Sequence, residues 1–146
     1  MTSTSLDREI KGHLGEHEIR YTRGRRSVVS ALAGSDGPRS VAALRTQIGL
    51  SLPLSSLYRT LSILEETGVV VHHFGASGVT LYELAEWLQG HHHHLVCTNC
   101  GSVDDVSLSQ SVESRIDALV DEMSAVASFS PSDHELEIHG LCSRCQ

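Results

Sequence analysis

The sequence predicts an α+β fold, with a helical N-terminal part that ends in a β-hairpin and a smaller C-terminal part that combines strands with one helix. Residues 5–67 contain apolar side chains at helical spacing, and residues 69–84 contain two β-rich runs around a glycine-containing loop. All four cysteines of the chain form two Cys-x-x-Cys pairs, Cys97/Cys100 and Cys142/Cys145. The 146 residues are enough for one good core or two small domains.

The first two predicted helices cover residues 5–18 and about 23–33. The first is closed off at Gly15 or soon after, and Gly34 stops the second. Each has an inward-facing apolar stripe: Leu6, Ile10 and Leu14 in the first, Val28, Val29 and Leu32 in the second. The opening turn of the second helix contains Arg23, Arg25 and Arg26. Cations are unfavourable at a helix N-terminus, so this cluster is better explained by an external anion.

Two further helices are joined by a tight turn. Ser40 caps a helix that includes Leu44, and the segment 49–53 ends in Pro53, which a helix cannot cross. The next helix spans about 54–67 and is followed by Gly68. This pattern predicts a helix-turn-helix, whose second helix enters the major groove of DNA. Its candidate DNA contacts are Ser55, Ser56, Tyr58, Arg59 and Ser62.

The hairpin over residues 69–84 follows the helix-turn-helix directly, as a wing does, with its turn at 75–78. We therefore expect a winged-helix DNA-binding domain over residues 1–84, a hinge over 85–90 and a metal-binding dimerisation domain over 91–146. Within residues 91–146 the sequence predicts strands near 92–97, 103–106 and 134–139 and a helix over about 108–126. About 56 residues are marginal for an independent fold, so dimerisation is expected to stabilise them.

The cysteine pairs favour a closed tetrahedral zinc site over disulfides. Disulfide frameworks are typical of short secreted chains, and the N-terminus lacks the apolar core of a signal peptide. We therefore expect a cytoplasmic protein with structural zinc bound by Cys97, Cys100, Cys142 and Cys145. No apolar run is long enough to span a membrane.

Histidines 91–94 lie immediately before the first cysteine pair. Side chains alternate between the faces of a strand, so His91 and His93 point to one side and His92 and His94 to the other. Two separate metal sites can therefore share this strand. An internal run is not an expression tag, which is terminal.

The net charge of −7 is divided unevenly along the chain. Residues 1–59 contain nine Lys/Arg and five Asp/Glu, whereas residues 60–146 contain two and thirteen. Seven arginines and a single acid, Asp36, lie between Arg20 and Arg59. This local basic region is typical of phosphate binding, although a solvated basic face gives the same pattern.

The sequence resembles the ferric uptake regulator family of metal-responsive repressors over essentially its whole length. The motifs that match are the segments 20–22, 57–61, 82–84, 92–101 and 138–145, in the right order and spacing. The resemblance implies a homodimer that binds a palindromic DNA operator, with metal as corepressor. Arg20 and Tyr21 belong to these motifs and join the arginines of the second helix as candidate DNA contacts.

The resemblance also implies two regulatory metal sites. The first comprises Glu83, His92, His94 and Asp105, and the second comprises His91, His93, Glu113 and His134. Iron and peroxide sensors have a histidine where this chain has Pro38-Arg39, and His72 or His73 of the wing is the candidate replacement. Nitrogen and oxygen ligands without thiolate suit Fe²⁺ or Zn²⁺, which we favour, and also Mn²⁺ or Ni²⁺.

Two other function classes remain as alternatives. A zinc-dependent hydrolase or deaminase needs an open zinc and, for a deaminase, a glutamate two residues after a histidine, which residues 91–94 lack. A role in metal storage or delivery accounts for the histidines but not for the helix-turn-helix. The sequence therefore favours a regulator over an enzyme.

Overall fold

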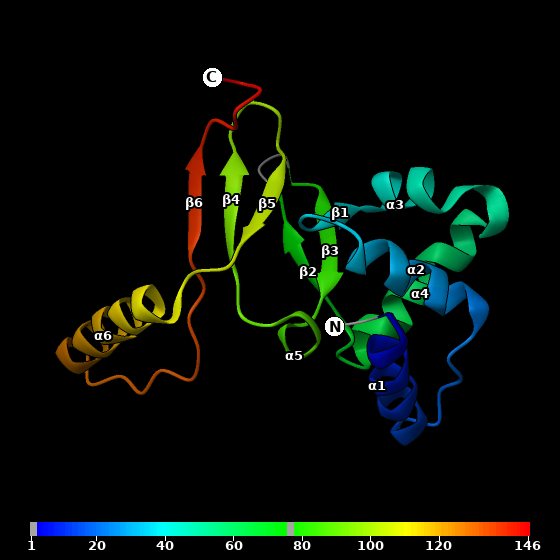
Figure 1. Ribbon diagram of the computed structural model, residues 1–146, viewed down its shortest axis with the longest axis horizontal. Coiled ribbons are helices and arrows are strands. Elements are labelled where there is room, and N and C mark those ends of the chain that lie inside the picture. The colour runs from blue at the N-terminus through cyan, green and yellow to red at the C-terminus, as the bar shows by residue number, and fades with distance from the viewer. Residues whose placement is uncertain (1–2, 76–77) are drawn as a thin grey trace.

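The computed structural model describes residues 3–75 and 78–146, which form a helical N-terminal part and two three-stranded sheets (Figure 1). The helices are α1 (Ser3–Glu16), α2 (Arg23–Ala33), α3 (Val41–Ile48), α4 (Leu54–Glu66), α5 (Glu86–Gln89) and α6 (Gln110–Val126), with one 3₁₀ turn, η1 (Gly49–Ser51). The strands are β1 (Arg39–Ser40), β2 (Val70–Phe74), β3 (Thr80–Leu84), β4 (His93–Cys97), β5 (Val103–Val106) and β6 (Glu137–Gly140).

The core of the N-terminal part is built from the apolar stripes of α1 to α4. The stripe residues predicted from sequence are buried together, and Val69, Val70, Leu84 and Leu88 extend this core to the hairpin and α5. Helices α3 and α4 are joined by η1, Leu52 and Pro53, which confirms the predicted helix-turn-helix. Burial of such large aliphatic side chains is the main force that stabilises this part.

Local signals set most helix ends. The Ser40 hydroxyl accepts a hydrogen bond from the amide of Ala43, as predicted, and Thr22 caps α2 in the same way. Gly68 has a φ of 69°, the left-handed conformation that closes α4 and favours glycine. Helix α1 begins at Ser3, two residues earlier than predicted, and ends at Glu16, directly after Gly15, as the predicted stop at Gly15 or soon after implies.

The hairpin after α4 forms the wing. Strands β2 and β3 pair antiparallel, and the short strand β1, which the sequence did not predict, pairs with the other edge of β3. Half of the predicted turn at 75–78 lies outside the described residues. The structure therefore has the predicted winged helix-turn-helix arrangement.

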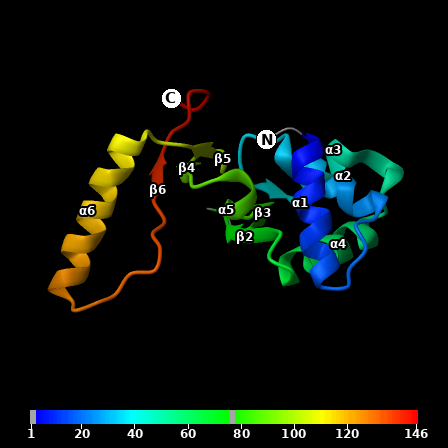
Figure 2. The same ribbon diagram turned by 60° about the horizontal axis from the view of Figure 1, so that its bottom comes forward.

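In the C-terminal part, β4 lies between β5, antiparallel, and β6, parallel. The last strand was predicted over 134–139, and β6 covers Glu137–Gly140, so it begins three residues later than predicted. Helix α6 begins two residues later than predicted and lies apart from the winged helix (Figures 1 and 2). None of its residues is buried: Val112, Ile116 and Val120 are half-buried, and Leu119 and Met123 are exposed within the protomer.

The two parts meet where the loop after α2 reaches β5. The amide of Asp105 donates a hydrogen bond of 2.9 Å to the carbonyl oxygen of Asp36. A Cβ at Gly37 would lie only 2.3 Å from the carbonyl oxygen of Val103, so this contact requires glycine. Within residues 3–75 and 78–146, no helix is long and apolar enough to cross a membrane.

Candidate metal centres

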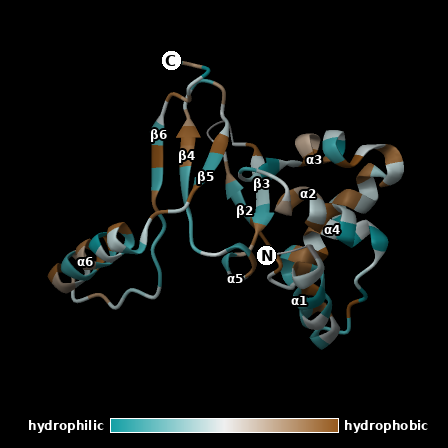
Figure 3. Cartoon of the chain, in the orientation of Figure 1, coloured by the Kyte–Doolittle hydropathy of each residue, from teal (hydrophilic) through white to brown (hydrophobic). Residues whose placement is uncertain are grey.

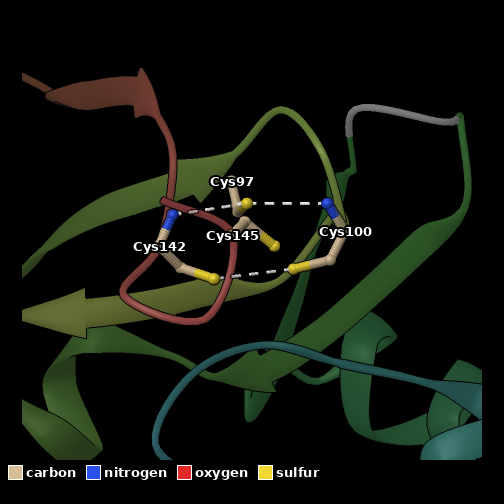
Figure 4. A group of neighbouring side chains, drawn as sticks. All are labelled: Cys97, Cys100, Cys142 and Cys145. Carbon is tan, nitrogen blue, oxygen red and sulfur yellow. Dashed lines mark hydrogen bonds between the residues drawn. The ribbon is translucent and has the colours of Figure 1, made fainter.

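The four cysteine side chains converge from the end of β4 with the loop that follows it, and from the loop after β6 (Figure 4). We call this group the four-cysteine cluster. Its sulfurs all lie within 4.8 Å of one another, and Cys100 Sγ and Cys142 Sγ are 3.8 Å apart. All four are free thiols, so the disulfide alternative does not describe this arrangement. Four sulfurs at about 2.3 Å from one zinc ion are about 3.8 Å apart, so the four-cysteine cluster fits a tetrahedral zinc site.

Backbone amides favour the thiolate form in this cluster. The amides of Cys100 and Cys142 donate to Cys97 Sγ at 3.5 and 3.4 Å. These two hydrogen bonds lower the pKa of Cys97 to about 6. Because a metal binds the thiolate and not the thiol, this environment prepares Cys97 for coordination.

A second group, the Glu83 cluster, comprises Glu83, His92, His94 and Asp105. The Nε2 atoms of His92 and His94 lie 3.0 and 3.2 Å from the Glu83 carboxylate, and His94 Nε2 lies 3.5 Å from Asp105 Oδ1. Glu83 belongs to β3 of the wing sheet, whereas the other three residues belong to β4, β5 and the segment before β4. This cluster therefore joins the two parts of the chain.

Strand alternation separates the two wing histidines. In the β2–β3 register Val71 lies opposite Glu83, and His73 lies on the same face two residues further on. His73 Nε2 hydrogen-bonds the Glu83 carboxylate, whereas His72 on the other face contacts Glu65 of α4. Of the two histidines expected at this site, the structure places only His73 beside the cluster.

The charged groups of the Glu83 cluster shift one another's pKa. Burial would raise the pKa of Glu83, but hydrogen bonds from His73 and His94 outweigh it and hold that pKa well below its usual range. The hydrogen bond with Glu83 raises the pKa of His73, although burial opposes it. Burial and the nearby negative charge of Glu83 raise the pKa of Asp105.

A third group, the His91 cluster, comprises His91, His93, Glu113 and His134. The Nε2 of His93 lies 3.1 Å from Glu113 Oε1, and those of His91 and His134 lie 3.8 and 3.9 Å from Glu113 Oε2. Glu113 comes from the first turn of α6. His91 and His92 precede β4, which begins at His93, yet the four histidines still divide between two clusters as alternation predicts.

Unpaired buried atoms test whether these clusters fit a cation. Five buried side-chain atoms of the described residues have no hydrogen-bond partner. Four of them belong to the two clusters: His91 Nε2, His93 Nδ1, His134 Nε2 and Asp105 Oδ1. Buried polar atoms normally have a partner, and a divalent cation coordinated by imidazole and carboxylate supplies one.

The candidate DNA contacts are mostly exposed, with three exceptions. Tyr58 is 52% exposed, and the exposed group also includes Arg20, Arg23, Arg26, Ser55, Arg59 and Ser62, whereas Tyr21, Arg25 and Ser56 are half-buried. The Tyr21 hydroxyl donates to Asp7, and Arg26 pairs with Asp7 at 3.5 Å while it lies over the Tyr21 ring. Tyr21 and Arg26 therefore also hold α1 against α2, a role that the sequence did not indicate.

Three contacts beside the clusters were not expected. Glu86 Oε1 lies 2.9 Å from His91 Nδ1, and Gln89 Nε2 donates to Glu83 Oε2 at 3.2 Å. Asp133 forms a further potential metal-binding group with Glu86 and His91. Neither spacing nor residue type distinguishes these residues in the sequence, because the turns that bring them together have no periodic signal.

Comparison with known proteins gives a consistent result. A family model described as the ferric uptake regulator family matches residues 16–139. The chain is 31% identical over 145 residues to a ferric uptake regulation protein from Bacillus subtilis, an alignment that covers 96% of this chain and 93% of that protein.

Solved structures show the same fold. The ferric uptake regulator Fur of Helicobacter pylori, described as having three functional metal-binding sites, superimposes with a TM-score of 0.76 at 22% identity, over 99% of this chain and 94% of that one. A zinc uptake regulator complexed with zinc and DNA superimposes with a TM-score of 0.59 at 23% identity, over 99% and 95% of the two chains.

Proposed function

Since the chain belongs to the ferric uptake regulator family of metal-responsive regulators, we propose that it is a homodimeric transcriptional repressor whose binding to DNA depends on a divalent cation in the Glu83 cluster. It acts in the cytoplasm, on a palindromic operator. Residues 1–84 bind DNA, residues 85–90 are the hinge, and residues 91–146 bind metal and dimerise.

One observation supports this proposal above all others: the Glu83 cluster takes ligands from both parts of the chain. Glu83 and His73 belong to the wing sheet, whereas His94 and Asp105 belong to the C-terminal sheet. A cation bound by both sets fixes the orientation of the winged helix relative to the C-terminal sheet. In a dimer this orientation determines whether two recognition helices fit two half-sites.

The residues that contact DNA are expected at the surface of α4 and at the start of α2. Tyr58 and Arg59 lie exposed on α4, in position to approach bases or the adjoining backbone. The arginines at the start of α2 hold phosphates: Arg23, Arg25 and Arg26. The likeness to a zinc uptake regulator complexed with DNA supports this use of the fold.

We assign a structural Zn²⁺ to the four-cysteine cluster and a regulatory divalent cation to the Glu83 and His91 clusters. The regulatory clusters contain only imidazole and carboxylate donors, which suit Fe²⁺ or Zn²⁺ best and also accept Mn²⁺ or Ni²⁺. When bound, the cation supplies positive charge and fixed ligand geometry, and it carries out no reaction.

The exposed apolar side chains of the C-terminal part support a homodimer. Helix α6 exposes Leu119, Met123 and Val126, and its hydrophobic residues are visible in Figure 3. Ile138 of β6 is 52% exposed. Exposed apolar surface of this kind is typical of a protein interface. We expect a dimer by light scattering and a shift toward monomer in Leu119→Glu; a wild-type monomer at all concentrations would contradict the proposal.

The test of the whole proposal is DNA binding as a function of metal. Untagged protein that retains its structural zinc is titrated with Fe²⁺, Mn²⁺, Ni²⁺ or Zn²⁺, and binding to operator-like duplexes is followed by fluorescence anisotropy. We expect about one tightly held zinc per chain and strong DNA binding only after a second ion is added. DNA binding that is equal with and without every metal would overturn metal dependence.

Adjacent histidines on β2 provide a matched pair of variants for the site assignment. His73→Ala removes a side chain that contacts Glu83, whereas His72→Ala removes its neighbour on the opposite face. We expect His73→Ala and His92→Ala to remain folded dimers with a metal requirement shifted to higher concentration. His72→Ala should respond as wild type does. Equal effects of the two wing variants would exclude His73 from the site.

A further inference from the structure

The short helix α5 contacts both regulatory clusters. At its first residue Glu86 Oε1 lies 2.9 Å from Nδ1 of His91, a member of the His91 cluster. At its last residue Gln89 Nε2 donates to Glu83 Oε2 at 3.2 Å and lies 3.4 Å from His92 Nε2, both of the Glu83 cluster. One helical turn therefore links side chains of two separate groups of metal-ligating residues.

The contact with Glu86 determines which nitrogen of His91 is free. A carboxylate can only accept a hydrogen bond, so in the neutral imidazole this contact places the hydrogen on Nδ1 of His91 and leaves the lone pair on Nε2. Nε2 is the atom that faces the His91 cluster, 3.8 Å from Glu113 Oε2, and it is buried without a hydrogen-bond partner among the described residues. The rings of His93 and His134 lie 4.8 and 4.9 Å from that of His91.

The contact with Gln89 acts on a carboxylate instead of an imidazole. Glu83 Oε2 accepts from the Gln89 amide while it also lies 3.0 Å from His92 Nε2. The amide adds no charge to this buried group and fixes the carboxylate rotamer. Gln89 therefore holds Glu83 in the position from which it faces His92 and His94.

We propose that Glu86 and Gln89 are positioning residues, through which α5 couples the two regulatory sites so that a cation in one raises the affinity of the other. This inference rests on the proposed function, because it requires both clusters to bind cations. A bound ion fixes its ligands and, through them, α5; the second ion then meets ligands that are already oriented. Such coupling is reciprocal by thermodynamic linkage.

Substitutions at Glu86 distinguish a positioning residue from a ligand. The Gln side chain of Glu86→Gln still accepts a hydrogen bond from His91 Nδ1, whereas Glu86→Ala does not. With Co²⁺ as probe and the Glu83 cluster disabled by His94→Ala, we expect Glu86→Ala to bind about tenfold more weakly at the remaining regulatory site. The Co²⁺ affinity of Glu86→Gln should stay within about threefold of that of the His94→Ala parent. Glu122→Ala removes an exposed carboxylate of α6 as a control.

The alternative is that Glu86 itself binds an ion, because it forms a potential metal-binding group with His91 and Asp133. In that case Glu86→Gln and Glu86→Ala would both lose one Co²⁺ per chain, and the positioning role would be overturned. Weakening in Glu86→Ala without loss of an ion supports positioning.

Coupling itself is measured by comparing Co²⁺ affinity at the His91 cluster with and without a functional Glu83 cluster. We expect an intact Glu83 cluster to raise this affinity about tenfold, within the range usual for coupled sites, and Gln89→Ala to reduce the difference to less than about twofold. Coupling that persists in Gln89→Ala would overturn this inference but not the proposed function. A wild-type protein that binds no Co²⁺ outside the four-cysteine cluster would overturn the proposed function as well.

Discussion

Gly37→Ala should weaken the contact between the winged helix and the C-terminal sheet without replacing any metal-ligating residue. The added methyl would lie 2.3 Å from Val103 O, 3.1 Å from Val103 C and 3.2 Å from Asp104 Cα, all of which are backbone atoms. Ordinary contact begins at 3.4 Å, so the loop must retreat by about 1 Å. The 2.9 Å hydrogen bond from the Asp105 amide to Asp36 O would then be lost.

The magnitude follows from two effects. Loss of the hydrogen bond costs about 0.5–1.5 kcal/mol, and overpacking of the interface costs about 1–3 kcal/mol. Together they weaken docking by about 1.5–4.5 kcal/mol, or roughly 10- to 2,000-fold in the docking equilibrium. Because the side chain of Asp105 belongs to the Glu83 cluster, metal affinity there should fall as well.

Hydrogen exchange at the Asp105 amide is the direct assay, and urea denaturation and Co²⁺ titration complement it. We expect Gly37→Ala to lose protection at this amide and to keep the zinc of its four-cysteine cluster. Gly34→Ala is the matched control, because its Cβ would meet Ser30 O at an ordinary 3.4 Å. Wild-type protection and stability in Gly37→Ala would refute the reasoning.

Three further predictions concern DNA, pH and zinc. Arg59→Ala should abolish operator binding at any metal level. Arg23→Ala should reduce the slope of log K for DNA binding against log salt concentration by about one unit. An unchanged slope would exclude a phosphate contact by Arg23. In the metal-free protein the His73–Glu83 pair contributes stability that is complete below the unfolded histidine pKa of 6.5 and is lost as pH rises through the raised pKa of His73. The lowered pKa of Glu83 makes the contribution of its charged form to stability complete above pH 4.5. Glu83→Gln should therefore reduce the free energy of unfolding most between pH 4.5 and 6.5 and less at about pH 9, as measured by urea denaturation. An equal reduction in both pH ranges would contradict the pairing. Cys142→Ser should lose zinc and expose residues 91–146 to protease before residues 3–75; retained zinc by elemental analysis would exclude the four-cysteine site.

Periodicity in the sequence predicted most of the N-terminal fold. Ile10, Leu14, Leu57 and Leu64 recur at helical spacing, and all four are fully buried. Helix ends were less predictable, because α1 covers Ser3–Glu16 whereas residues 5–18 were predicted, and Gly15 lies within its last turn. A glycine within the last turn reduces helix stability only slightly, and packing of Leu14 compensates for it.

The candidate sites were predicted as sets of residues but not as positions in space. Alternation separated His92 and His94 from His91 and His93, and the structure places these pairs in two different groups. The choice between His72 and His73 could not be made from sequence, because it depends on the register of β2 against β3. That register puts His73 on the face of Glu83.

The sequence by itself determined the helices of the helix-turn-helix, the hairpin of the wing and the division of the histidines, because each follows from residue spacing along a single helix, turn or strand. It predicted the convergence of the two Cys-x-x-Cys pairs from zinc chemistry, because a closed tetrahedral site needs four ligands. Only the tertiary structure decided that α6 has no buried side chain, that Glu86 and Gln89 contact two different clusters, and that Gly37 packs against Val103. These contacts join segments that are distant in sequence or lie around irregular turns. They are set by how the two sheets dock, and local periodicity does not determine that docking.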